Sequence, residues 1–191
     1  MNLPNKITIA RLILTMIFVA VMSLPIPYRY TIAVNLFIIA SLSDFLDGYI
    51  ARKRNLVTTF GKLMDPLADK ILTGATFILL TVEGKIAAWM VVVIISREFL
   101  VTGLRLVATS RGFVLAADWA GKWKTILQMS IGIYLLFQLA TVEIPCAWAT
   151  PLFEWKPWLI FGQVLIWLTV ALTLFSGVSY LWKNRELLVD D

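Results

Sequence analysis

Ser43-Asp44-Phe45-Leu46-Asp47-Gly48 and Asp65-Pro66-Leu67-Ala68-Asp69 place four of the chain's seven aspartates in one short stretch, with long apolar runs on both sides. An ionised carboxylate at the depth of a lipid bilayer is costly and is rarely kept without a partner. The usual partner of several clustered acids is a metal ion. The function of the chain should therefore be sought in this stretch.

The apolar runs around it belong to a chain of 191 residues that is 60% hydrophobic and only 15% charged, with a mean hydropathy of +0.84. Soluble globular domains lie well outside these values. Six apolar stretches are close to the ~20 residues that span ~30 Å of hydrocarbon: 7–24, 31–50, 66–82, 86–107, 123–139 and 158–182. We therefore predict one all-α, polytopic membrane domain over residues 1–191, with six transmembrane helices.

The basic residues predict how this domain is oriented, because Lys and Arg accumulate in cytoplasmic loops. Arg29, Lys85 and Lys156 fall on one side of a six-span chain, and the other fourteen of the seventeen fall at or toward the opposite side. Both termini are therefore expected in the cytoplasm, where the formal charge of +5 meets anionic lipid head groups. Nucleic acid is not an expected partner, since the sequence has no recognition helix and no basic–aromatic pattern.

The first residues allow two interpretations. Lys6 and Arg11, followed by an apolar run, are compatible with a secretory signal, but no small-residue cleavage site follows. We favour a short N-terminal interfacial segment in which Asn5 or Thr8 caps a helix at the membrane surface, before the chain turns inward.

Helical geometry predicts that the four acids lie at similar depths. Asp44 and Asp47 are roughly 20 and 24 Å from the external boundary at residue 31, at ~1.5 Å per residue. The next helix is expected to begin at Pro66, a favoured residue for a first helical position, with Asp65 as its cap and Asp69 one turn deeper. Spacings of three and four put each pair on one helical face. Two antiparallel helices can therefore aim all four carboxylates at one space.

Such an arrangement predicts a bridging site for hard cations. Two carboxylates about 6 Å apart repel by roughly 3 kcal/mol at an effective dielectric of 20, so cations or protons must be bound. The chain has no histidine and one cysteine, which favours Mg²⁺ or Mn²⁺ over zinc and copper. Structural salt bridges are the alternative, but too few basic residues lie at the same depth to neutralise all four acids.

Small and basic residues surround the acids. Gly48, Ala51 and Gly61 leave room for a ligand to approach the backbone, although small residues in membrane helices usually serve packing. Arg52 opens a run of three basic residues that can hold phosphate oxygens. Such a run at the end of a helix is also an ordinary topology signal.

The whole pattern, Asp44-x2-Asp47-Gly48-x2-Ala51-Arg52-x8-Gly61-x3-Asp65-x3-Asp69, resembles the motif of the CDP-alcohol phosphatidyltransferase family at all of its positions. Eight fixed residues at fixed spacing are a specific signal. Residues 2–8, 96–105 and 121–125 are also similar to bacterial members of this family that use glycerol 3-phosphate. The resemblance covers most of the chain and weakens over the external loops and the last span.

This resemblance implies transfer of a phosphatidyl group from CDP-diacylglycerol to glycerol 3-phosphate, giving phosphatidylglycerol phosphate and CMP. It implies that two divalent cations are held by four residues: Asp44, Asp47, Asp65 and Asp69. Asp69 would also be the base that takes the alcohol proton. The CDP-diacylglycerol site would be lined by Asp47, Gly48, Ala51, Arg52 and Gly61. The active site would face the cytoplasm at a bacterial plasma membrane, in a homodimer surrounded by membrane lipids.

An acceptor that carries a phosphate needs a second cationic pocket, for which the candidates are Arg97, Arg105, Lys122 and Lys124. Arg97 lies about 16 Å from residue 86, near the bilayer midplane, where a lone guanidinium is costly. Arg105 lies about 80° around the same helix. Alternatively, Arg97 forms a structural bridge with Glu98 or with an aspartate. We disfavour the Glu98 bridge because adjacent residues point apart on a helix.

Two other functions remain open from the sequence. The same chemistry could use serine or inositol phosphate as acceptor, although the basic pocket argues against a neutral one. A divalent-cation carrier could use the acids as its filter. Against a carrier, all four acids lie toward one face, and no polar path to the other face is visible in the sequence.

Overall fold

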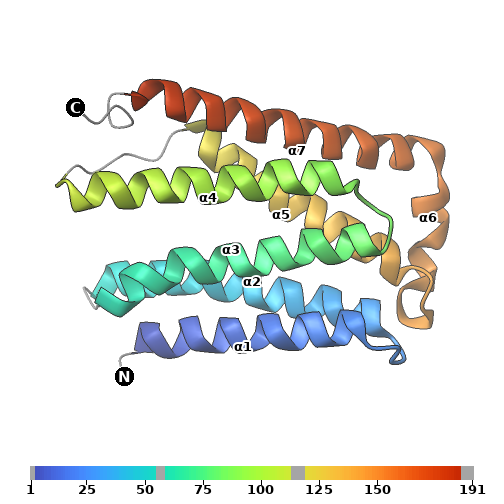
Figure 1. Cartoon of the computed structure of the whole chain (residues 1–191). Coiled ribbons are helices and arrows are strands. Elements are labelled where there is room, and N and C mark those ends of the chain that lie inside the picture. The colour runs from blue at the N-terminus through green and yellow to red at the C-terminus, as the bar shows by residue number, and fades with distance from the viewer. Residues whose placement is uncertain (1–2, 55–58, 113–118, 186–191) are drawn as a thin grey trace.

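The computed structural model describes residues 3–54, 59–112 and 119–185, without the side chains of residues 3–8, 44–54, 59–69 and 110. Within these ranges, six long helices form an elongated bundle (Figure 1). They are α1 (Leu3–Ser23), α2 (Arg29–Arg54), α3 (Thr59–Val82), α4 (Ala88–Ser110), α5 (Trp119–Ala140) and α7 (Lys156–Lys183). A 3₁₀ helix, η1 (Ile144–Ala149), and the short α6 (Thr150–Glu154) connect α5 to α7. The predicted all-α fold is confirmed.

The two ends of the bundle carry different parts of the chain. Figure 1 shows the start of α1 and the end of α7 on one side, which we call the terminal end, together with the ends of α2 and α4 and the starts of α3 and α5. The opposite, far end holds the α1–α2 and α3–α4 connections, η1 and α6. There Gly84 ends α3 with a φ of +69°, which glycine adopts without strain, and the N–H of Lys85 donates to the carbonyl oxygen of Leu80 at 2.9 Å. This turn places Lys85 at the far end.

Apolar contacts between α1, α2, α3 and α5 form the main core. Phe18 of α1 and Phe37 of α2 are fully buried, with ring centroids 6.3 Å apart. Phe77 and Leu136 join the same core from α3 and α5. Along the other side of the bundle α4 packs on α7, where Tyr180 is buried. Side-chain packing in this core thus holds α1, α2, α3 and α5 together, and α4 and α7 cover it and contribute buried residues such as Ile94 and Val170.

The predicted number of membrane spans is not confirmed. Among the described residues only α7 is long and apolar enough to cross a membrane alone. α5 with the segment Ile144–Glu154, bent by 111°, would be a second if the pair is one span. Shorter apolar segments lie at Ile9–Ser23, Arg29–Ser43 and Lys70–Val82. α4 contains Arg97, Glu98 and Arg105, and these charges lower its hydropathy.

The predicted start of the first helix is wrong. α1 begins at Leu3 and continues without a break to Ser23. Asn5 and Thr8 therefore lie inside the helix, and neither is its cap. The polar residues of the first turns lower the local hydropathy, but they leave the backbone hydrogen bonds of a helix unaffected, and Pro4 is well tolerated in a first turn.

The predicted start of α3 is also wrong. The helix begins at Thr59, seven residues before Pro66, so Asp65 lies inside it and is not its cap. A proline inside a helix removes one backbone donor and disfavours the residue before it, but it does not always end the helix. The first two turns of α3 thus bring Gly61 and Asp65 onto the same helix as Asp69.

Candidate active site

The four aspartates lie at matching levels on two neighbouring helices. Asp44 and Asp47 precede the end of α2 by ten and seven residues, and Asp65 and Asp69 follow the start of α3 by six and ten. At ~1.5 Å per residue these positions are about 15, 10, 9 and 15 Å from the terminal end. α2 and α3 are in contact and run in opposite directions. Asp44 is therefore level with Asp69, and Asp47 with Asp65.

The side chains of these aspartates lie outside the described part of the structure, so the convergence of the carboxylates stays a prediction. The same holds for the contacts of Gly48, Ala51, Arg52 and Gly61, whose backbone lies in the last two turns of α2 and the first turn of α3. Among the side chains that the structure does describe, no three from His, Cys, Asp and Glu are grouped as a metal site. The structure does show that the backbone positions of the four aspartates lie level with one another on α2 and α3. We call this arrangement the aspartate register.

A polar cluster next to this register joins α3, α4 and α5. We call it the Glu98 cluster, and it consists of Lys70, Arg97, Glu98, Lys124 and Gln128. The Nζ of Lys70 donates to the carbonyl oxygen of Glu98 at 3.2 Å. The Nζ of Lys124 donates to Oε1 of Glu98 and, at 3.1 Å, to Oε1 of Gln128. Lys70 directly follows Asp69, the fourth aspartate of the motif, so the Glu98 cluster and the aspartate register are adjacent on α3.

Arg97 belongs to this cluster. Its Nη1 lies 3.5 Å from Oε1 of Glu98, so our argument against a bridge between these adjacent residues is wrong. Side chains of this length reach one another from neighbouring positions, and Lys124 holds the same carboxylate oxygen from α5. Lys124 is only 4% exposed, and a charge buried to that degree needs charged or polar partners. Two of the predicted phosphate-binding cations, Arg97 and Lys124, are thus brought together.

Two glycines lie against Arg97, and one of them is needed to make room for it. A methyl group at Gly177 of α7 would lie 2.9 Å from Cγ of Arg97, and one at Gly121 of α5 would lie 3.6 Å from its Nη2. The first distance is shorter than close packing allows. α7 can therefore approach the arginine only with a residue that has no side chain, and Arg97 lies between α5 and α7.

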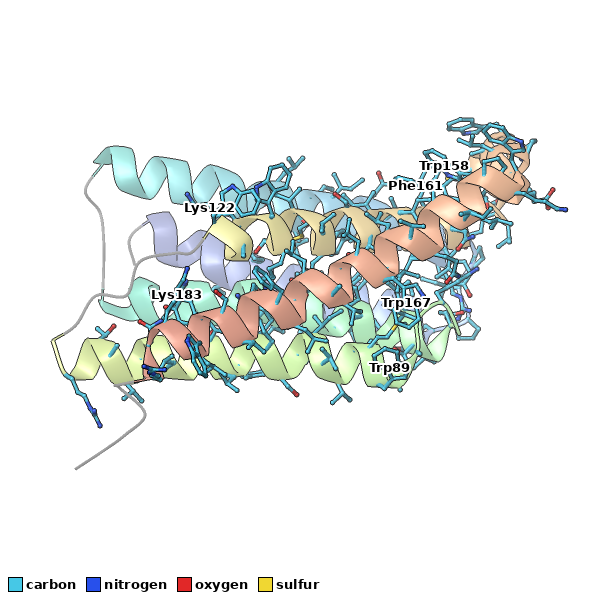
Figure 2. All side chains as sticks on the ribbon, turned by 90° about the horizontal axis from the view of Figure 1, so that it is seen from above. Trp89, Lys122, Trp158, Phe161, Trp167 and Lys183 are labelled. Carbon is cyan, nitrogen blue, oxygen red and sulfur yellow. The ribbon has the colours of Figure 1, made fainter. Side chains whose placement is uncertain are left out.

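Arg105 and Lys122 lie closer to the terminal end and outside the Glu98 cluster. The Nε of Arg105 donates to the hydroxyl of Tyr180 at 3.0 Å, and its guanidinium carbon is 5.3 Å from the centroid of that ring. This contact docks Arg105 on α7, about two turns of α4 beyond Arg97. Lys122 is exposed near the start of α5 (Figure 2). These two cations therefore stand between the cluster and the terminal end.

The sequence analysis missed Lys70, Gln128 and Tyr180. Lys70 and Gln128 carried usable signals: Lys70 adjoins Asp69, and Gln128 lies one turn after Lys124 on the same helical face. Tyr180 had only the general expectation that the hydroxyl of a buried tyrosine finds a partner. Its partner comes from another helix, which no local pattern indicates.

Comparison with known proteins gives one consistent result. Residues 1–175 match the family model described as CDP-alcohol phosphatidyltransferase. A protein of Bacillus subtilis (strain 168) named CDP-diacylglycerol–glycerol-3-phosphate 3-phosphatidyltransferase is 44% identical over 98% of this chain and 97% of its own length. Proteins with the same name are 35% identical in Rickettsia bellii (strain RML369-C), over 94% of this chain and 93% of the relative, and 33% identical in Haemophilus influenzae (strain ATCC 51907 / DSM 11121 / KW20 / Rd), over 100% and 97%.

Proposed function

Because the chain belongs to the CDP-alcohol phosphatidyltransferase family, we propose that it transfers the phosphatidyl group of CDP-diacylglycerol to glycerol 3-phosphate, giving phosphatidylglycerol phosphate and CMP. The relatives named for these two substrates match 94–100% of the chain. On this proposal the protein is an enzyme of phospholipid biosynthesis.

The observation that best supports the proposal is that the aspartate register and the Glu98 cluster adjoin on α3. α3 carries both Asp69 and Lys70, and Lys70 reaches the backbone of Glu98 on α4. An acceptor that reacts through a hydroxyl and carries a phosphate needs a proton-accepting group near the reacting hydroxyl and cations near the phosphate. In this proposal Asp69 is the proton acceptor, and the cations lie in the Glu98 cluster, which begins at the next residue.

The donor set of the register fits divalent cations. In a chain without histidine, four carboxylates at matching levels offer the oxygen donors that Mg²⁺ and Mn²⁺ prefer. Two such ions would be held by Asp44, Asp47, Asp65 and Asp69. When bound, they would neutralise the charge of the diphosphate and of the departing CMP.

Asp69 is the proposed base. Its carboxylate takes the proton of the 1-hydroxyl of glycerol 3-phosphate while that oxygen bonds to the β-phosphorus of CDP-diacylglycerol. The bond from the β-phosphorus to the bridging oxygen breaks, and CMP leaves with the electron pair. The nucleotide part of the lipid is held by Asp47, Gly48, Ala51, Arg52 and Gly61. The small residues permit close approach, and Arg52 pairs with phosphate oxygens.

The acceptor phosphate binds beside the Glu98 cluster in this proposal. Arg97 and Lys124 face it from α4 and α5, where Glu98 fixes their positions. Arg105 and Lys122, nearer the terminal end, attract the dianion and complete the pocket. A neutral acceptor such as serine would gain nothing from these cations.

We further propose that the bundle spans a bacterial plasma membrane six times, with the active site and both termini in the cytoplasm. Large exposed apolar side chains on every long helix support membrane embedding, among them Met16, Ile39, Ile78, Val92, Ile126 and Phe175. Exposed tryptophans lie near both ends, as at membrane–water boundaries: Trp119 and Trp182 at the terminal end, Trp148 and Trp155 at the far end. A homodimer is proposed on the family alone.

The decisive experiment measures CMP release from CDP-diacylglycerol by the purified protein. We expect release only with glycerol 3-phosphate, loss of release with a chelator, and recovery with Mg²⁺ or Mn²⁺. Release with serine or inositol phosphate in its place would assign another acceptor. Metal flux in liposomes without any CMP release would replace the enzyme by a carrier.

A further inference from the structure

A cavity lies at the far end, remote from the aspartate register. It has a volume of about 860 Å³ between α5 and α7, and the turn at Gly84 and Lys85 contributes to its lining. Pockets that hold small ligands have volumes of about 300–1,000 Å³. Its floor depends on Gly162, because a methyl group there would lie 2.5 Å from the ring of Tyr134. Figure 2 shows Phe161 and Trp167 of α7 in this half of the molecule.

One part of the cavity lining is polar and positively charged. It contains Lys85, Gln138 and Gln163. Among the described residues, the side chains of these three make no hydrogen bond or ion pair. Glu83, the nearest acid in sequence, is bound to Arg29 at 3.2 Å and to the hydroxyl of Tyr30 at 2.7 Å. The charge of Lys85 and the two amides are therefore available to a ligand.

The rest of the cavity is apolar. Leu135 contributes from α5, and Val164, Trp167 and Leu168 contribute exposed surface from α7. Between residues 160 and 171 the lining follows α7 for about 16 Å, at ~1.5 Å per residue, toward the middle of the bundle. A ligand that fits has an anionic or polar head at the far end and a long apolar tail.

We infer that this cavity, a groove between α5 and α7, binds an anionic phospholipid from the membrane leaflet at the far end, opposite the proposed active site. Charge complementarity selects the head group: the described lining contains a lysine and no carboxylate. The phosphate of a zwitterionic lipid meets the same lysine, but its ammonium group finds no acid there. The inference goes beyond the proposed function and requires only that the bundle lies in a membrane.

Quenching of Trp167 by brominated lipids tests the inference. The protein is placed in vesicles of zwitterionic lipid containing either brominated phosphatidylglycerol or brominated phosphatidylcholine, and the signal of Trp167 is the difference between wild type and Trp167→Phe. We expect half-maximal quenching at a roughly fivefold lower fraction of the anionic lipid, the effect of about one lysine near a membrane surface. Lys85→Gln should abolish this preference.

Lys156→Gln is the matched control, since Lys156 is an exposed lysine at the same end that does not line the groove. It should keep the preference for the anionic lipid. The Tm of each variant in detergent reports folding independently of lipid binding and of activity. Equal quenching by both lipids in folded wild-type protein would overturn the inference, and so would an unchanged preference in Lys85→Gln. Disulfide formation between two copies through Ala171→Cys, with no quenching by either lipid, would assign the groove to a second copy instead.

Discussion

Asp69 is the side chain on which turnover should depend most. We predict that Asp69→Asn lowers the rate of CMP release by about 10²–10⁴-fold, the usual contribution of a general base. Asparagine has nearly the same size but cannot accept a proton, so binding of CDP-diacylglycerol should remain measurable. Rate and lipid binding are to be determined on the same preparation.

Glu154→Gln is the control for this variant, because it removes one carboxylate from the exposed surface of α6 at the far end. It should leave the rate unchanged. A rate for Asp69→Asn within tenfold of the wild type would remove Asp69 from the role of base.

Arg105 should act on the acceptor and not on the nucleotide lipid. We predict that Arg105→Ala raises the KM for glycerol 3-phosphate about tenfold and changes kcat less than twofold, since a charged hydrogen bond to phosphate is worth about 1.5 kcal/mol or more. Tyr180→Phe loses the 3.0 Å hydrogen bond to Arg105 but keeps the ring, so a smaller rise is expected. Steady-state kinetics with varied acceptor decide this, and an unchanged KM in Arg105→Ala would place the phosphate pocket elsewhere.

At the scale of single residues, the sequence drew attention to Arg97 and Lys124 but did not predict that they share a partner. Arg97 and Lys124 stood out because charges in apolar helices are rarely without a role. Their shared partner, Glu98, was discounted on local helix geometry alone. The contact forms because Lys124 arrives from α5 at the same oxygen, and proximity across helices is set by packing that no local spacing encodes.

The start of α2 depends on a carboxylate from another element. The Oε1 of Glu143 accepts the N–H of Tyr30 at 2.9 Å, and its Oε2 accepts the N–H of Thr31 at 2.8 Å and the hydroxyl of Thr31 at 2.6 Å. First-turn N–H groups have no partner within their own helix. We predict that Glu143→Ala lowers the free energy of unfolding by about 1–2 kcal/mol, seen as a lower Tm in detergent, while CMP release per folded molecule is kept.

The same substitution at Glu154 separates this cap from a general effect of charge. Glu154→Ala also removes a carboxylate from the far end, but among the described residues its side chain makes no hydrogen bond. Its Tm should equal that of the wild type. Equal Tm values for Glu143→Ala and wild type would show that water replaces the cap without cost.

The helical glycines differ in whether the surrounding side chains leave room for a methyl group. A methyl group at Gly162 would meet the ring of Tyr134 at 2.5–2.8 Å, whereas one at Gly103 meets nothing within 4 Å. We predict that Gly162→Ala destabilises the protein by about 1–3 kcal/mol through overpacking. Gly103→Ala should be neutral or stabilising by up to about 1 kcal/mol, because alanine is the better helix former. Thermal unfolding of the two variants side by side is the measurement, and similar losses would contradict it.

At the scale of elements, the sequence predicted the six long helices and the short connections between most of them. Their apolar stretches are long, and this signal does not depend on tertiary contacts. The helix starts were missed because polar first turns and Pro66 look like boundaries, although a helical backbone can continue through both. No helix was predicted between residues 139 and 158, where the structure contains η1 and α6.

Charged residues are unevenly distributed between the two ends of the molecule. The register of aspartates, the Glu98 cluster and most basic residues lie in the half that holds the termini, and Trp158, Phe161, Trp167 and Trp89 lie in the other half (Figure 2). The proposed acceptor, glycerol 3-phosphate, is soluble in water, whereas the diacylglycerol part of the proposed donor is not. A site about 10–15 Å from one end of a bundle, by helical rise, meets both substrates only if that end faces the compartment that supplies them.

α7 offers a direct test of this orientation, because it is the described helix that can cross a membrane alone and it has an exposed lysine at each end, Lys156 and Lys183. In a Cys146→Ser background, Lys156→Cys and Lys183→Cys each lose one charge and gain the chain's one thiol. We predict that a membrane-impermeant maleimide labels Lys156→Cys in intact cells and labels Lys183→Cys only after the membrane is opened. Basic residues gather at the Lys183 end, and such residues stay in the cytoplasm. Labelling of both thiols from outside would place α7 on one side of the membrane, and the reverse order would put the aspartates outside, away from any supply of CDP-diacylglycerol.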